Sequence, residues 1–507
     1  MKRFSNLQEL IAAGADDAPA FTAPGAAALT YAGLRATIAR GVQRLNAAGI
    51  GRGDRVAIVL PNGPEMAAAF VTVASCAAAA PLNPGYRAEE FDFYLSDLNA
   101  RALIVDRGSQ SPAVEVARQR GIAIIELIPG DAGAGAFDLQ APATASPPAG
   151  PGGMAGSGDV ALILHTSGTT SRPKIVPLTQ ANVCASACNV RDTLALTAAD
   201  RGLNIMPLFH IHGLIAGLLA PLAAGGSIFC TPGFNALKFF AWMQEARPTW
   251  YTAVPTMHQT ILARAAQNKE VIAANPLRFI RSSSSSIPPQ VIRELEIVFG
   301  APLIESYGMT EAAHQMASNP LPPRKRVPGS VGLAAGPDVA IMDEQGSLLP
   351  PGSTGEIVIR GPNVTSGYEN NAKANAEAFS DGWFRTGDQG IMDSEGYVSI
   401  TGRLKEIINR GGEKVSPREI DEVLMDHPAV QQVVTFAIPH DKLGEEVGAA
   451  VVLREGTSLS EKELREFAAR RLADFKVPRK ILFLDEIPKG ATGKLQRIGL
   501  AAKLGLA

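Results

Sequence analysis

The stretch 164–174, LHTSGTTSRPK, joins an apolar segment to a run of hydroxyl-bearing residues, a glycine and a final Arg-Pro-Lys. Hydroxyl groups, a glycine that permits close backbone approach and a lysine can together hold a phosphate. The stretch is not a Walker A loop, which requires Gly, four residues and then Gly-Lys-Ser/Thr. The one Gly-Lys pair, Gly493-Lys494, is followed by Leu495 and has no glycine five residues before Gly493. We therefore expect a phosphate-binding loop that serves another nucleotide chemistry.

The composition limits the class of protein. The chain has 507 residues, of which 46% are hydrophobic, and we expect cores for roughly two to four units. The formal net charge is only −2, with no block of like charges, which argues against a nucleic-acid partner and leaves a small anionic ligand open. The cysteines form no Cys-x-x-Cys pair, so we expect buried, reduced thiols at Cys76, Cys184, Cys188 and Cys230.

Neither the ends of the chain nor its apolar stretches predict export or membrane insertion. The segment 1–21 contains Glu9, Asp16 and Asp17 and no long apolar run, so it does not resemble a signal peptide. The uncharged stretches 66–86 and 202–237 are broken by prolines and polar residues, which favours buried strand-turn-helix structure. The C-terminal LGLA is no peroxisomal signal. We expect a cytoplasmic protein without a membrane partner.

Short apolar runs alternate with helical patterns over the first 400 residues or so. RVAIVL (55–60), ALIVD (102–106) and VALILH (160–165) are typical of buried strands, and segments such as PQVIRELEIVFG (289–300) are typical of amphipathic helices. This alternation predicts an α/β protein with largely parallel sheets. The segment 129–159, rich in Ala, Gly and Pro, is predicted to be an exposed connection. The last hundred or so residues, after Arg403, have a plausible size for a separate small domain.

Four further motifs follow the first in a fixed order: YGMTE (307–311), TGD (386–388), GRLKEIINRGGEK (402–414) and PKGATGK (488–494). Together with TSGTTSRPK they resemble the motif set of the adenylate-forming family of acyl-CoA synthetases, luciferases and peptide-synthetase adenylation domains. The resemblance covers nearly the whole chain. It implies an α/β N-terminal domain, 1–402, with mostly parallel sheets and a small β-barrel-like subdomain. It also implies a small mobile α+β C-terminal domain, 403–507.

The resemblance implies an ATP-dependent ligase that uses Mg²⁺ and coenzyme A. A carboxylate attacks the α-phosphorus of ATP to give an acyl-adenylate and pyrophosphate, and a thiol then displaces AMP. The protein's task in such chemistry is positioning and charge stabilisation.

The resemblance also assigns the nucleotide-binding residues. Tyr307 matches the aromatic residue that stacks on adenine, Thr310 the hydroxyl at the α-phosphate, and Glu311 the Mg²⁺ ligand. Asp388 matches the carboxylate that binds the ribose hydroxyls, with Arg403 as its second partner. The residues that match the family's grip on the β- and γ-phosphates are Thr166, Ser167, Gly168, Thr169, Thr170 and Lys174.

Three further roles follow from the resemblance in the C-terminal part. Lys494 matches the catalytic lysine that contacts the acid and the α-phosphate during adenylation. Lys405 matches the hinge about which the small domain rotates between the two half-reactions. Gly411 and Gly412 are expected to line the channel for the pantetheine arm of CoA, where missing side chains permit a narrow approach.

The acyl pocket is predicted to be small and polar. The segment RSSSSSIPP stands where the family commonly has Gly-Ala residues, so Ser283, Ser284 and Ser285 are expected to narrow the pocket and supply hydroxyl donors, and His314 follows closely after Glu311. A second carboxylate on the acid could pair with a protonated or suitably oriented imidazole. Together with PLFHIHGLIAGLL, TWYTAVPTMHQ and INRGGEKVSP, these features resemble the oxalate-CoA ligase branch. The serine run as a solvated turn, and His314 as a partner of a backbone carbonyl, remain alternatives.

The other histidines carry weaker signals. His210, in the Phe209-His210 pair, resembles the aromatic gate of the acyl pocket and is assigned to substrate binding, because a zinc site would lack a third ligand. His165 and His212 receive no functional role. Malonate, short fatty acids and aryl acids remain alternative substrates, and a carrier protein loaded in trans or an inactive nucleotide-binding protein remain alternative functions. The sequence does not indicate an oligomeric state.

Overall fold

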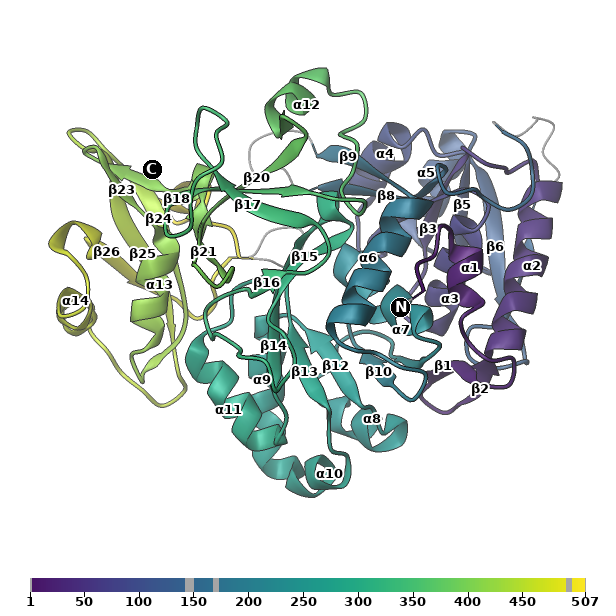
Figure 1. Ribbon diagram of the computed structural model, residues 1–507, viewed down its shortest axis with the longest axis horizontal. Coiled ribbons are helices and arrows are strands. Elements are labelled where there is room, and N and C mark those ends of the chain that lie inside the picture. Colours follow the sequence, from purple (N-terminus) through teal and green to yellow (C-terminus); the bar gives the residue numbers. More distant parts are fainter. Residues whose placement is uncertain (1, 142–149, 167–172, 489–494, 507) are drawn as a thin grey trace.

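The structure of the protein is a computed structural model that describes residues 2–141, 150–166, 173–488 and 495–506. Two large sheets and two smaller ones organise the chain (Figure 1). No helix in the described ranges has both the length and the apolar character that a membrane span requires. All four cysteine side chains are buried and free, as predicted.

The first large sheet has seven strands in the order β7-β6-β5-β3-β4-β8-β9. Its inner pairs are parallel, and the two outer pairs, β6 with β7 and β8 with β9, are antiparallel. The strands are β3 (Arg55–Val59), β4 (Ala78–Pro81), β5 (Ala102–Asp106), β6 (Ala123–Pro129), β7 (Phe137–Gln140), β8 (Val160–Thr166) and β9 (Lys174–Thr179). The apolar runs that predict strands at 55–60, 102–106 and 160–165 are therefore confirmed.

The prediction that 129–159 is only an exposed connection is wrong in part. Its residues 137–140, Phe-Asp-Leu-Gln, form β7, in which Phe137 and Leu139 are buried and Gln140 is exposed. The alternation of apolar and polar side chains fits a strand with one buried face. The strand is only four residues long, and the composition of the Gly- and Pro-rich segment around it favours the prediction of a loop.

The second large sheet has nine strands in the order β16-β15-β14-β13-β12-β10-β11-β1-β2. Its strands from β14 to β1 in this order pair in parallel, and the flanking strands pair antiparallel. The strands are β1 (Pro19–Ala23), β2 (Ala26–Thr30), β10 (Arg201–Asn204), β11 (Ser227–Cys230), β12 (Trp250–Ala253), β13 (Phe279–Ser282), β14 (Leu303–Met309), β15 (His314–Ser318) and β16 (Leu333–Ala334).

Helices cover these sheets, and their ends follow local sequence signals. Thr179 caps α6 (Gln180–Thr193) by accepting from the backbone of Asn182, whose side chain accepts from the backbone of Thr179 in return. Pro289 begins α11 (Pro289–Phe299), and Gly300 ends it with φ +62°, a conformation that favours glycine. The other helices of this part are α1 (Leu7–Ile11), α2 (Tyr31–Ala47), α3 (Pro64–Ala74), α4 (Ala88–Asp97), α5 (Pro112–Gln119), α7 (Ala220–Ala223), α8 (Phe239–Ala246), α9 (Pro255–Ala265) and α10 (Lys269–Ala274).

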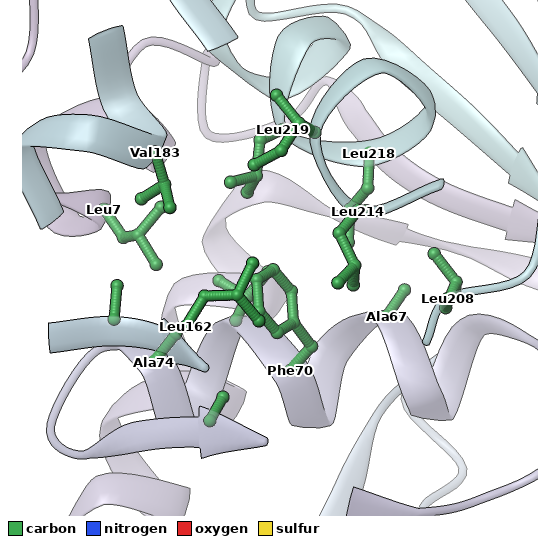
Figure 2. Packing of buried hydrophobic residues seen from close by; sticks show 14 of the residues in the cluster. Leu7, Ala67, Phe70, Ala74, Leu162, Val183, Leu208, Leu214, Leu218 and Leu219 are labelled. Carbon is green, nitrogen blue, oxygen red and sulfur yellow. The ribbon is translucent and has the colours of Figure 1, made fainter. Parts of the chain in front are cut away.

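The largest core lies where elements of both sheets meet. Figure 2 shows the ring of Phe70 (α3) between Leu162 of β8 and Leu214, which belongs to the π-helix η1 (His212–Leu219), and Val183 of α6 beside Leu7. These side chains are all buried. The same core therefore fixes η1, whose first residue is His212, against the seven-stranded sheet.

Two smaller sheets complete the fold. The first is antiparallel and contains β17 (Asp338–Met342), β18 (Thr354–Arg360), β19 (Phe379–Ser380), β20 (Trp383–Met392) and β21 (Val398–Arg403), with α12 (Ala372–Ala378) beside it. Where the family resemblance implies a small β-barrel-like subdomain, the structure has this five-stranded sheet.

The last sheet has its own core and its own helices, α13 (Pro417–Met425), α14 (Glu461–Ala469) and α15 (Leu500–Lys503). Its strands are β22 (Ile408–Arg410), β23 (Glu413–Val415), β24 (Val430–His440), β25 (Gly444–Leu453) and β26 (Lys480–Phe483). Figure 1 places this unit on the far side of β17–β21 from the seven-stranded sheet. We propose the boundary between domains 1–402 and 403–507 at this transition, because β21 ends at Arg403 and β22 begins at Ile408.

Phe70→Ala is expected to destabilise the large domain by about 3 to 5 kcal/mol, because it removes a fully buried ring from the core of both sheets. The measurement is the shift of the first unfolding transition in urea. Leu237→Ala, at a side chain that is 72% exposed, should change stability by less than about 0.5 kcal/mol. Equal effects of the two changes would contradict the packing described here.

Candidate active site

The carboxyl end of β14 meets β20 and β21 at a buried tyrosine. The hydroxyl of Tyr307 donates a hydrogen bond to Oδ2 of Asp388. Oδ1 of Asp388 lies 3.2 Å from Nε of Arg403. Burial, and then the negative charge of Asp388, raise the pKa of Tyr307 well above its usual value. The structure thus brings together three residues that the sequence assigns to the adenosine part of ATP.

A second group lies just beyond the end of β14. Thr310 and Glu311 belong to the short 3₁₀ turn Thr310–Ala312. Oε1 of Glu311 accepts a hydrogen bond of 2.8 Å from the hydroxyl of Tyr368, and Nζ of Lys174 lies 4.0 Å from the centre of the Tyr368 ring. The sequence analysis missed Tyr368, which lies in none of the five motifs. Its ring packs beside the lysine and its hydroxyl orients the glutamate.

Burial dominates the electrostatics of this group. It raises the pKa of Glu311, although the Tyr368 hydrogen bond and Lys174 oppose the shift. It lowers the pKa of Lys174, although the negative charge of Glu311 opposes this shift as well. The positive charge of Lys405 lowers the pKa of Lys174 further, so the predicted hinge residue acts electrostatically on the phosphate loop's lysine.

The two flanks of the predicted phosphate loop are held together. Thr166, at the end of β8, is paired with Lys174, at the start of β9, in an antiparallel ladder. The predicted loop residues Ser167, Gly168, Thr169 and Thr170, and the predicted catalytic Lys494, lie outside the described residues.

The predicted hinge lies between two ion pairs. Lys405 is in the 3₁₀ turn Leu404–Glu406, directly after Arg403. On its other side, Oε2 of Glu406 lies 3.2 Å from Nε of Arg497, whose Nη2 is 2.7 Å from Oδ2 of Asp421. Arg497 therefore ties the hinge turn to α13.

The predicted pantetheine-channel glycines form the turn between β22 and β23. Gly411 and Gly412 have φ values of +60° and +99°, which favour glycine. A Cβ atom at Gly412 would meet no described atom within 4 Å. This turn therefore presents bare backbone at the surface of the small sheet.

The carboxyl ends of β12 and β13 lie close to His314 on the predicted acyl side of the site. Arg281, on β13, is fully buried and donates hydrogen bonds of 3.0 Å to Nε2 of His314 and 3.3 Å to Oε1 of Gln315. Its other terminal nitrogen donates bonds of 3.3 Å each to His212 and Thr252. Burial lowers the pKa of Arg281 to about 9. The sequence analysis missed this arginine, although a charge in the otherwise apolar run LRFIRS is a signal that could have found it.

The serine run divides into a buried part and an exposed part. Ser283 is buried and its hydroxyl donates to the carbonyl oxygen of Ser306 at 3.1 Å. Ser284 is half-buried, with its Oγ 3.0 Å from Nδ1 of His212, whereas Ser285 is exposed. The run is thus neither wholly a solvated turn nor wholly a pocket lining.

The histidines are placed differently from one another. His314 is buried, and its ring stacks on that of His212 at a centroid distance of 4.9 Å. His210 is half-buried, with its ring centre 4.5 Å from that of Phe209. Nε2 of His165 lies 3.0 Å from Oδ2 of Asp97. The stacked pair brings His212, which the sequence left unassigned, into the predicted acyl side.

Comparisons with known proteins identify the family of the chain and solved structures that resemble it. A family model for AMP-binding enzymes matches residues 9–369, and a model for the C-terminal domain of such enzymes matches residues 419–494. The chain is 46% identical to an oxalate–CoA ligase of Arabidopsis thaliana, with 97% of each chain covered. It is 43% identical to an oxalate–CoA ligase of Saccharomyces cerevisiae, with 88% of this chain and 86% of that protein covered. The solved structure of ATP-bound MatB from Rhodopseudomonas palustris is similar with a TM-score of 0.88, at 30% identity and with 98% of each chain covered.

The chain therefore belongs to the AMP-binding enzyme family. The fold class and the enzyme class predicted from the five motifs, an α/β acid–CoA ligase that forms AMP, are confirmed.

Glu311→Gln is expected to lower the pKa of Lys174 further, because the carboxylate favours the charged form of the lysine. The measurement is the pH titration of the ¹³C-methylated lysine signal by NMR. Glu377→Gln is the matched control, since its carboxylate acts on Lys174 in the same direction but less strongly. An unchanged or raised pKa in Glu311→Gln would contradict the interaction.

Proposed function

We propose that this acid–CoA ligase activates oxalate. ATP adenylates one carboxylate of the acid with release of pyrophosphate, and the thiol of CoA then displaces AMP to give oxalyl-CoA. Similarity to the two oxalate–CoA ligases supports the acid, and similarity to ATP-bound MatB supports the nucleotide. The observation that carries the proposal is the buried positive charge of Arg281.

Among the described residues, this charge has no negative partner. Within the residues that the structure describes, no carboxylate forms an ion pair with Arg281, and its Nε makes no hydrogen bond. At a pKa of about 9 the guanidinium is charged near pH 7. A buried, uncompensated charge costs several kcal/mol. A substrate that carries a second negative charge would offset this cost.

A dicarboxylate fits this requirement better than a monocarboxylate. One carboxylate has to face the nucleotide residues, and the rest of the acid then faces Ser284 and His314. Both side chains can offer hydrogen-bond donors to a second carboxylate. His314 is hydrogen-bonded directly to Arg281, and Ser284 is linked to Arg281 through His212. An apolar acyl tail would leave these groups without compensation. Oxalate is the smallest acid that meets the demand. His210 and Ser283 remain proposed parts of the same pocket.

For the nucleotide we propose the roles that the motifs imply. Tyr307 stacks on adenine, and Asp388 with Arg403 binds the ribose. Thr310 contacts the α-phosphate, while Lys174 and the loop that precedes it hold the β- and γ-phosphates. Glu311 suits a Mg²⁺ ligand, because it offers a hard oxygen donor already held in place by Tyr368. When bound, the ion would neutralise phosphate charge.

In the small domain we propose Lys494 as the residue that stabilises the approach of the acid to the α-phosphorus. Lys405 is the proposed hinge, and Gly411 with Gly412 the proposed lining for the CoA arm. The bare backbone of this turn supports the latter role. Coenzyme A is the proposed acceptor rather than a carrier protein, because the chain resembles CoA ligases over nearly its whole length.

A panel of acids tests the substrate. We expect oxalate to give the highest kcat/KM for CoA-dependent AMP release among oxalate, malonate, sulfoacetate, butyrate and a coumarate. Ser284→Ala and His314→Ala should each lower the oxalate value by about tenfold to a hundredfold, because each removes a hydrogen bond to a charged group. The exposed Ser285→Ala is the control. A preference for butyrate or the coumarate would end the oxalate proposal.

The half-reactions test the catalytic lysine and the hinge together. Lys494→Ala should lower the rate of adenylate formation by orders of magnitude, while a preformed oxalyl-adenylate is still converted to the thioester. Lys405→Pro should show the reverse pattern, because proline fixes φ at the pivot and hinders rotation of the small domain. Rapid-quench measurement of each half-reaction separates the two cases. Equal losses in both half-reactions for both variants would contradict these roles.

A further inference from the structure

We propose that Arg281, Thr252 and His212 are positioning residues that fix the hydroxyl of Ser284 as a hydrogen-bond donor toward the acid. The inference deepens the proposed function and rests on it for the identity of the acid. The chain of hydrogen bonds itself is a property of the folded protein. It can therefore be tested apart from the choice of substrate.

The protonation of both stacked histidines follows from Arg281. Its Nη1 lies 3.3 Å from Nε2 of His212, and its Nη2 lies 3.0 Å from Nε2 of His314. A guanidinium group has donors and no acceptor, so each Nε2 has to offer a lone pair. Both rings are therefore neutral, with the proton on Nδ1. His314 is therefore a donor as a suitably oriented neutral imidazole and not as a protonated one.

Thr252 gives the chain its direction. Its Oγ1 accepts from Nη1 of Arg281 at 3.3 Å and lies 2.6 Å from Nε2 of His212. Because Nε2 accepts, the threonine proton points to the histidine. Nδ1–H of His212 then donates to Oγ of Ser284 at 3.0 Å. Every step runs from the buried guanidinium outward, and successive bonds of this kind strengthen one another.

Ser284 ends the chain as a donor. Its Oγ accepts from His212, which leaves its own proton for another acceptor, and no acceptor for it is found within the described residues. The residue is held at φ +73°, in the left-handed region that a serine seldom adopts. Such a backbone conformation persists only where the surroundings impose it. The half-buried hydroxyl is thus the point at which the chain meets a ligand.

The direction of the chain selects the chemistry of the acid's far end. A carboxylate oxygen accepts hydrogen bonds only, so it matches Ser284 as a donor. A neutral hydroxyl at the same place can accept the bond as well, but without a charge it accepts more weakly than a carboxylate does. The chain therefore favours oxalate over glycolate, which differs from it by a hydroxymethyl group in place of one carboxylate.

NMR of ¹⁵N-histidine-labelled protein tests the chain directly. We expect His212 and His314 to be neutral with the proton on Nδ1 at pH 7. His258 is an internal reference with the opposite tautomer, because its Nε2 lies 3.2 Å from the carbonyl oxygen of Arg281, which can only accept. Burial lowers the pKa of His258 to about 4, so it is neutral as well. A charged His212, or a proton on its Nε2, would overturn the proposal.

Kinetics tests whether the chain acts on the acid. His212→Ala should lower kcat/KM for oxalate by about tenfold to a hundredfold, reduce the preference for oxalate over glycolate, and leave KM for ATP unchanged. His212→Asn keeps an N–H near the position of Nδ1 and should recover most of the loss. Thr252→Val, which removes the hydroxyl, should lower kcat/KM for oxalate as His212→Ala does, whereas Thr252→Ser, which keeps it, should lower it less. Equal losses in His212→Ala and His212→Asn, or an unchanged oxalate preference, would overturn the proposal.

Oxalate as the substrate and the positioning role of the hydrogen-bond chain can be contradicted separately. In one case, wild-type protein prefers an acid other than oxalate, His212 carries its proton on Nδ1, and His212→Asn recovers kcat/KM for that other acid. The oxalate proposal is then wrong, and the positioning role remains supported. If oxalate is preferred and the tautomer is the opposite one, the proposed function stands and the positioning role falls.

Discussion

The parallel pairing of β12, β13 and β14 is the constraint on which the site depends. Thr252 is in register with Arg281, and Arg281 with Ile304, so the carboxyl ends of the three strands reach the same edge of the sheet. Crevices outside the carboxyl ends of parallel strands are common ligand sites in α/β proteins. Here the edge presents Thr252 and Arg281 on one side and Tyr307 on the other. The positions proposed for the acid and the nucleotide therefore adjoin at this edge of the sheet.

The grouping of the residues proposed to bind the nucleotide was largely predictable from the sequence. Tyr307, Thr310, Glu311, Asp388 and Arg403 stand in short motifs whose order is specific even where each motif alone is weak. The apolar runs predicted the buried strands for the same reason, because burial on both faces leaves a continuous hydrophobic pattern. The pairing order of the strands was not predictable, since it depends on contacts between residues far apart in the chain. The strand β7 was missed because its four residues lie within a Gly- and Pro-rich segment.

The polar network on the predicted acyl side of the site could not be predicted from the sequence. Arg281 is one charged residue in an apolar strand, and its hydrogen-bond partners come from η1, β12 and β15. Only the fold brings His212 and His314 together, because about a hundred residues separate them in the chain. Tyr368 likewise acts through Glu311 and Lys174, which are distant in sequence. A motif records residues that are neighbours in the chain, whereas a buried polar network joins residues that are neighbours in space.

The ion pairs that flank Lys405 have a mechanical consequence. Arg403 is attached to β20 through Asp388, and Glu406 is attached to the small domain through Arg497. Only Leu404 and Lys405 are left between these two attachments. So short a link has few backbone torsions to vary, and it cannot extend far. The proposed rotation of the small domain is thus limited to the few torsions of this link, which directly follows Arg403, the partner of Asp388.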